Sequence, residues 1–201
     1  MASTDHPLQC RCGHLTGTVA QTARVTRATC YCRHCQAYAH ALGHPEAILD
    51  DIGGTDIVAT LQQYVRLIKG TDSLACLSLS DRGLLRWYAR CCDTPIDNTA
   101  RSPKLSYVGL VHTCLGPSQR SLDAAFGHTS MPVNTKHAKA PVAASAFTAL
   151  TSVARIFASV ARARLDGSYK QSPFFVEALG TPVVAPRILS ATERAQAMNA
   201  V

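Results

Sequence analysis

Cys10-Arg11-Cys12-Gly13, Cys30-Tyr31-Cys32-Arg33-His34-Cys35 and Cys91-Cys92 are three short stretches that hold seven of the nine cysteines of this chain. Thiolates that are one to three residues apart on a tight turn can point at the same metal ion. Zinc takes four tetrahedral ligands in structural sites, and three protein ligands plus an open position in reactive sites. The three clusters therefore predict two zinc ions per chain, one held by four sulfurs and one by three.

The composition is that of a globular protein. Of 201 residues, 47% are hydrophobic and 16% are charged, which excludes a disordered chain. Residues 1–7 lack the basic and apolar segments of a secretory signal, so we expect a cytoplasmic protein whose cysteines are reduced or metal-bound. The most apolar stretch, 142–161, contains Arg155 and several hydroxyl side chains, which argues against a membrane span.

The first cluster has the pattern of a two-cysteine metal knuckle, in which Gly13 permits a sharp chain reversal. Two sulfurs cannot complete a tetrahedral site, and Cys91-Cys92 is the candidate for the second pair. Successive side chains of an extended backbone point apart. Either the chain turns sharply at 93–95, or only one of these two cysteines is a ligand and Cys91 is a free thiol.

The middle cluster places Cys30, Cys32 and Cys35 on one short segment, where three sulfurs can cap one face of an ion. A free fourth position on zinc is where a nucleophile is activated or a carbonyl polarised. An iron–sulfur cluster is the rival, but it requires a fourth ligand, and none follows at a typical spacing. His34 is a further candidate ligand or proton shuttle, although a side chain next to Cys35 is expected to point away.

Alternating segments predict a mainly β fold, with a small antiparallel core over residues 1–116. We expect strands near 15–19, 64–69, 74–79, 84–88 and 105–112, and a long loop over 36–56, where glycines and a proline interrupt the pattern. The remaining cysteines, Cys76 and Cys114, lie in or just after two of these strands and are expected to be buried thiols.

Residues 117–201 are expected to form a C-terminal extension whose main element is a helix at about 142–165. Its apolar side chains recur at helical spacing and predict a face that packs on the core, with Arg155, Ser159 and Arg162 opposite. That apolar face consists of Phe147, Leu150, Ala154, Phe157 and Ala161. A membrane-surface helix and a partner-docking helix are the alternatives. Ser190 and Glu193 have capping-box spacing, which predicts a short final helix.

The order of the clusters resembles one known family over roughly residues 8–112. Seventeen residues separate Cys12 from Cys30, and a later strand leads into a cysteine followed by Asp93-Thr94-Pro95. This arrangement is similar to the glutathione-dependent formaldehyde-activating enzymes, a family that includes centromere protein V. The family's last pair is spaced Cys-x-x-Cys, whereas here Ala89 stands at its first position when the pattern is aligned on Cys92.

The resemblance implies a small β-rich "tent" with two zinc ions. A structural zinc would be held by Cys10, Cys12, Cys92 and Cys91, and a reactive zinc by Cys30, Cys32 and Cys35. The implied activity is that of a carbon–sulfur lyase, which joins a thiol such as glutathione to formaldehyde or another small aldehyde. No catalytic residue beyond the cysteine triplet is assigned.

The charge pattern adds candidates for binding an anionic thiol. Arg33 lies inside the triplet, and Arg86 and Arg90 precede the third cluster. The alternative function is a non-catalytic, zinc-stabilised scaffold or binding module. Nucleic-acid binding is the least favoured, because the basic residues are dispersed and aromatic residues make up only 6% of the chain, whereas single-strand binders need stacking platforms in a positive groove.

Overall fold

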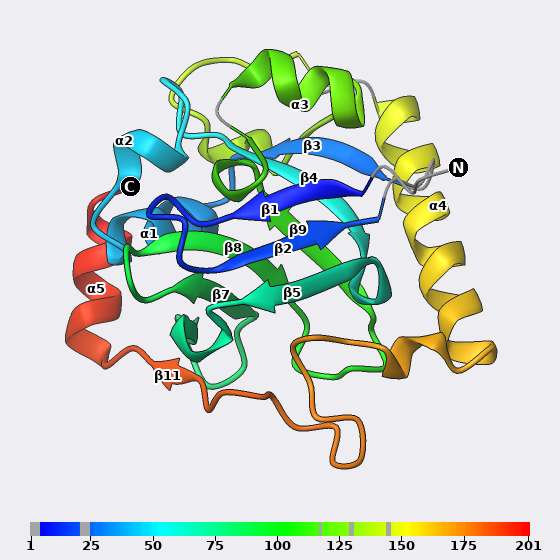
Figure 1. The fold of residues 1–201 in the computed structure, drawn as a ribbon. Coiled ribbons are helices and arrows are strands. Elements are labelled where there is room, and N and C mark those ends of the chain that lie inside the picture. The colour runs from blue at the N-terminus through cyan, green and yellow to red at the C-terminus, as the bar shows by residue number, and fades with distance from the viewer. Residues whose placement is uncertain (1–4, 21–24, 117, 129–130, 144–145) are drawn as a thin grey trace.

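The computed structural model describes residues 5–20, 25–116, 118–128, 131–143 and 146–201, and for 146–149 the backbone only. Two β-sheets form its centre (Figure 1). The smaller sheet has the order β1-β2-β5, made of β1 (His6–Gln9), β2 (Thr16–Val19) and β5 (Val65–Lys69). The larger sheet has the order β10-β3-β4-β9-β8-β7-β6-β11. Its strands are β3 (Thr26–Cys30), β4 (Thr55–Leu61), β6 (Leu74–Ser78), β7 (Leu85–Ala89), β8 (Thr94–Thr99), β9 (Tyr107–Val111), β10 (Met131–Val133) and β11 (Arg187–Ile188).

The predicted mainly β fold is confirmed, and all five expected strands are present as β2, β5, β6, β7 and β9. The pairings within residues 1–116 are antiparallel. The two edge strands, β10 and β11, instead pair in parallel with β3 and β6. Residues beyond 116 therefore complete both edges of the larger sheet.

The main hydrophobic core lies between the two sheets. Leu8, Leu15 and Val19 of the smaller sheet and its turn pack with Trp87 and Leu110 of the larger one, and all are almost completely buried. Burial of such side chains contributes about 1.5–3 kcal/mol each. The remaining cysteines, Cys76 and Cys114, lie in this core, as predicted. This core covers one face of the larger sheet and also includes Leu122.

The helices occupy the sides of the sheets (Figure 1). They are α1 (Arg33–Ala41), α2 (Pro45–Ile48), α3 (Gln119–Phe126), α4 (Ala146–Leu165) and α5 (Ala191–Asn199). Short 3-10 turns span Gln62–Tyr64, Thr71–Ser73, His112–Cys114, Thr135–His137 and Ser168–Lys170. The predicted capping box is confirmed at the start of α5, where Ser190 and Glu193 bond reciprocally.

The prediction of a long loop over 36–56 was wrong. Most of α1, all of α2 and the start of β4 fall in this range. Two of the expected loop breakers mark helix ends instead, whereas Gly53 and Gly54 lie just before β4. Gly43 follows α1 with a φ of 81°, a conformation that favours glycine, and Pro45 opens α2, where a missing N–H costs nothing.

The predicted core-facing side of α4 was also wrong. Leu150 and Phe157 are 69% and 67% exposed, while Val160 and Ala163 are buried against Leu61. Ala154 and Ala161 are exposed as well, and the side chain of Phe147 lies outside the described residues. The helix carries apolar residues on more than one side, so periodicity alone could not select the buried face. Within the described ranges, no helix is both long and apolar enough to cross a membrane.

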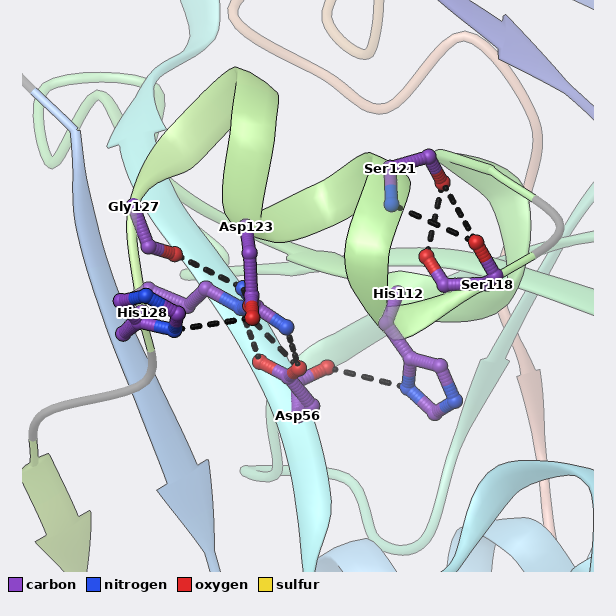
Figure 2. A network of polar contacts seen from close by, with 8 residues as sticks. Asp56, His112, Ser118, Ser121, Asp123, Gly127 and His128 are labelled. Carbon is purple, nitrogen blue, oxygen red and sulfur yellow. Dashed lines mark hydrogen bonds and ion pairs between the residues drawn. The ribbon is translucent and has the colours of Figure 1, made fainter.

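Polar contacts join α3 to the larger sheet through Arg27 of β3. Figure 2 shows the partners Asp56, Asp123, Gly127 and His128. Arg27 is 3% exposed. Its guanidinium donates hydrogen bonds to both carboxylate oxygens of Asp56, to the Asp123 carboxylate at 2.6 Å and to the Gly127 carbonyl at 2.7 Å. His128 lies 2.8 Å from the same Asp123. These contacts satisfy the charge of Arg27 with two carboxylates.

Asp97 on β8 is the opposite case. Its side chain is fully buried, and neither carboxylate oxygen has a hydrogen-bond partner within the described part of the chain. Burial without compensation disfavours the charged form and raises the pKa of Asp97 well above its ordinary value. The fold therefore favours the neutral form of this carboxyl group.

Candidate metal centres

The first centre gathers four cysteines from two turns that are distant in sequence. Cys10 and Cys12 lie in the turn between β1 and β2, and Cys91 and Cys92 lie in the turn between β7 and β8. The four sulfurs all lie within 4.8 Å of one another. Individual Sγ–Sγ distances are 3.6 Å from Cys10 to Cys12, 3.3 Å from Cys12 to Cys91, and 3.8 Å from Cys91 to both Cys10 and Cys92.

A sharp turn explains how two adjacent cysteines face the same point. The Cys92 N–H donates to the Ala89 carbonyl, and Asp93 adopts a positive φ of 53°. The backbone therefore reverses at Asp93 instead of remaining extended, which is the first of the two alternatives considered from the sequence. On the other side of the centre, the Gly13 N–H closes the knuckle on the Cys10 carbonyl, with a φ of 78° at Gly13.

The four-cysteine centre fits a tetrahedral zinc ion. Zinc–sulfur bonds of about 2.3 Å require sulfurs roughly 3.8 Å apart, close to the distances found. The Leu15 N–H donates to the sulfur of Cys10 at 3.2 Å, which is how a bound thiolate is stabilised. Burial acts to raise the pKa of Cys92, but the Thr94 hydroxyl and the Cys12 N–H outweigh it and lower the pKa to about 6. This centre connects the smaller sheet to the larger one.

The second centre is built where β3 meets α1. Cys30 is the last residue of β3, Cys32 is the N-cap of α1, and Cys35 lies in the first turn of the helix. The Cys35 N–H donates to the Cys32 sulfur at 3.3 Å, and the sulfurs of Cys30 and Cys35 are 3.7 Å apart. All three sulfurs lie within 4.8 Å of one another. The N-terminus of a helix favours thiolates, so the local structure already favours metal ligation.

The three thiols share their ionisation. Hydrogen bonds from the thiols of Cys30 and Cys35 lower the pKa of Cys32 to about 2, against the opposing effect of burial. The pKa of Cys35 is raised well above its ordinary value, first by its hydrogen bond to Cys30 and then by that to Cys32. A cation at the centre would favour loss of the remaining protons, and three clustered sulfurs fit a zinc ion with one position left for another ligand.

Arg86 is the cation nearest to this centre. It is 3% exposed, its Nη1 lies 3.9 Å from the Cys35 sulfur and donates to Asn98 at 2.9 Å, and its guanidinium lies 5.0 Å from the ring centre of Tyr38. Within the described residues no carboxylate forms an ion pair with it. A buried charge is costly unless it is compensated, so the sulfurs of the triplet are its counter-charge.

A cavity of about 700 Å³ opens directly beside the triplet. Cys30, Cys32, Cys35 and Arg86 form one part of its lining, and α4 forms another through Ile156 and its neighbours. Most of the other lining residues are apolar. The four-cysteine centre does not contribute to this cavity. The two centres therefore differ in surroundings, and the triplet lies in the wall of a space that can admit a small molecule.

The predicted arginines lie in different places. Arg86 lines the cavity, whereas Arg33 is exposed and donates to the Met198 carbonyl at 3.0 Å. Arg90 is exposed and donates to the Asp72 carbonyl. The structure thus brings one of the three to the site. His34 also lines the cavity, but the group of potential metal ligands at the triplet consists of Cys30, Cys32 and Cys35 without it.

Sequence reasoning missed three residues of this site. Asn134 donates from Nδ2 to the Cys30 sulfur at 3.4 Å, Asn98 holds Arg86, and Tyr107 lines the cavity. Asn134 follows β10 and adopts a positive φ of 55°, which asparagine tolerates better than most residues. No sequence motif marks Asn134, because it reaches Cys30 only through the pairing of β10 with β3, which the sequence does not reveal.

Comparison with known proteins identifies the family. No curated protein matches the sequence. Among solved structures, the chain is similar to the crystal structure of a protein from Rhodobacter sphaeroides, with 18% identity, a TM-score of 0.44, and coverage of 63% of this chain and 97% of that chain. A family model described as a family of unknown function, DUF6151, matches residues 2–185. Because this match spans most of the 201 residues, the chain belongs to the DUF6151 family.

Proposed function

We propose that this protein is a zinc-dependent enzyme of the carbon–sulfur lyase type, which joins a glutathione-like thiol to a small aldehyde at the cysteine triplet. The single observation that carries the proposal is the position of the three sulfurs. They converge on one point, and that point lies in the wall of a cavity large enough for a small molecule. A purely structural zinc would need neither the cavity nor a missing fourth sulfur.

Cys30, Cys32 and Cys35 are the residues that would hold the ion. Zinc, when bound there, would supply the acidity that keeps a coordinated thiol deprotonated at neutral pH. Three thiolate ligands make the metal a weak Lewis acid, which favours presenting a thiolate over activating water. The mostly apolar lining of the cavity offers few groups that could activate water.

The chain's own residues prepare the site for an anion. Arg86 is buried beside Cys35, and Asn98 fixes the direction of its guanidinium. A fixed positive charge in a poorly solvated site stabilises negative charge without reorganisation. The same arginine would favour both the thiolate of the substrate and the alkoxide that forms when the thiolate adds to a carbonyl carbon.

Exchange NMR tests the proposal directly. Glutathione and formaldehyde form their adduct slowly without a catalyst, and we expect zinc-loaded protein to accelerate the exchange. Cys32→Ser should abolish the acceleration, and Cys76→Ser should preserve it, because Cys76 lies in the core away from the cavity. No acceleration by a protein that carries two zinc ions would favour the alternative, a zinc-stabilised scaffold without catalysis.

A further inference from the structure

The floor of the cavity is made by small side chains on four neighbouring strands. Ala28 of β3, Ala59 of β4 and Ala100 just after β8 line it, and Cys30 and Arg86 lie on the same face of the sheet. Gly109 of β9 lies between these strands, where an added Cβ would approach the Tyr107 hydroxyl to 2.8 Å and Ile57 to 3.0 Å. The three alanines leave space above their part of the sheet, whereas the side chains of Tyr107 and Ile57 cover Gly109.

The walls of the cavity are apolar. Val153, Ile156, Phe157 and Val160 of α4 line one side, and the remaining apolar lining residues are Ile57, Leu79, Leu84, Leu105, Met131 and Val133. This explains why Phe157 stays apolar although it is largely exposed. Figure 1 shows α4 running along the side of the sheets. Its residues Val160 and Ala163 pack against Leu61, and Val160 also lines the cavity.

Charged groups are confined to two places in the lining. Arg86 is buried beside the sulfurs, whereas Arg82 and Arg194 are exposed. A glutathione-like thiol carries charged groups on both arms, and an apolar interior would strip their hydration at high cost. We therefore expect the charged arms of the thiol to lie near Arg82 and Arg194, and its sulfur to lie at the triplet. The apolar part of the cavity is left for the other reactant.

We propose that the aldehyde used by this protein carries an apolar chain of several carbons, which lies between the sheet face and α4. The proposal rests on the function proposed above and names its second substrate. Formaldehyde would leave nearly all of a 700 Å³ cavity unused, whereas cavities of this size and lining bind molecules of drug-like size.

The chemistry balances without a further reactant. The thiolate sulfur attacks the carbonyl carbon, a carbon–sulfur bond forms, and the carbon–oxygen π bond breaks. The electron pair moves to oxygen, which takes a proton from water, so the product is a hydroxyalkyl thioether. Nothing is oxidised or reduced, and the reverse reaction releases the aldehyde and the thiol.

Binding of unreactive analogues tests the apolar chain separately from catalysis. Calorimetry with the zinc-loaded full chain would measure the affinities of straight-chain primary alcohols from butanol to decanol. We expect about a fourfold gain in affinity for each added methylene until the cavity is filled. Ala59→Leu should fill the floor and weaken hexanol binding about tenfold. The same change at Ala154, which is exposed and outside the lining, should have no effect; Ala100→Leu replaces Ala59→Leu if that variant does not fold.

Rates measured with hexanal and formaldehyde complete the test. Preference for hexanal, lost in the floor variant, supports the proposal. Equal rates for the two aldehydes together with no alcohol binding would overturn it and leave the proposed function intact. Chain-length-dependent alcohol binding without acceleration for either aldehyde would overturn the proposed function, while the assignment of the cavity to an apolar ligand would stand.

Discussion

The two cysteine centres use the same ligand chemistry in opposite surroundings. The four-cysteine centre ties two turns together near the surface, with Cys12 and Cys91 exposed. The triplet is more deeply set, with Cys30 and Cys35 buried, and it has a cation and a cavity beside it. Four thiolates around Zn²⁺ carry a net charge of −2 that water can solvate. Three would carry −1, and the buried Arg86 lies beside them as a counter-charge.

This difference indicates that the four-cysteine centre helps to hold the fold together, whereas the triplet is built on elements that are held by other contacts. The first centre closes a segment of about eighty residues, since it links Cys10 to Cys91, so metal binding there is coupled to folding. The second is contained between residues 30 and 35, and it rests on a strand and a helix held by other contacts. Each prediction below changes one centre and uses the other as its reference.

The largest contrast is expected between Cys12→Ser and Cys32→Ser. Loss of Cys12 should unfold the protein, because structural zinc contributes on the order of 10 kcal/mol to folding in small domains. Loss of Cys32 should leave a folded protein that binds one zinc ion instead of two. Circular dichroism melts and elemental analysis measure both effects, and equal unfolding by the two substitutions would contradict the division of roles.

Chelation should remove the two metals in separate steps. We expect two zinc ions per purified chain, and the triplet ion should leave first, because it has three protein ligands and a cavity through which a chelator can approach. The helical signal should persist through the first step and disappear in the second. A zinc-sensitive dye combined with circular dichroism follows both. Release of both ions in a single transition would remove the distinction between the centres.

The two buried arginines offer a matched pair of substitutions with smaller effects. Arg27→Met leaves Asp56 and Asp123 without their shared cation, so we expect a loss of about 3 kcal/mol in unfolding free energy with unchanged zinc content. Arg86→Met removes the counter-charge of the triplet and should weaken its zinc binding about tenfold, with less effect on stability. Denaturant titration and competition with a zinc indicator separate the two results. Unchanged zinc affinity in Arg86→Met would show that the sulfurs do not depend on this cation.

The sequence predicted the cysteine groupings well, because ligand spacing is local and chemically restrictive. It left the role of Cys91 open, because the answer depends on the positive φ of Asp93, which no residue type dictates. The cavity could not be predicted, since Ala28, Ala59 and Ala100 are unremarkable in their own strands and form a floor only after the strands pair. The face of α4 was misassigned for a related reason, because Phe157 lines a cavity and looks like a core residue.

The buried carboxyl of Asp97 adds the uptake of a proton to the folding of this protein. In the unfolded chain an aspartate ionises near pH 4, whereas in the fold burial raises the pKa of Asp97 and favours its neutral form. Below about pH 4 burial of Asp97 therefore requires no change of its protonation state. As the pH rises from there toward the pKa of Asp97 in the fold, the folded protein progressively loses stability. Asp97→Asn should raise the melting temperature at pH 7 and leave it nearly unchanged at pH 4, relative to the parent chain at each pH. If the stability of Asp97→Asn falls less steeply with rising pH than that of the parent chain, Asp97 is the source of this pH dependence.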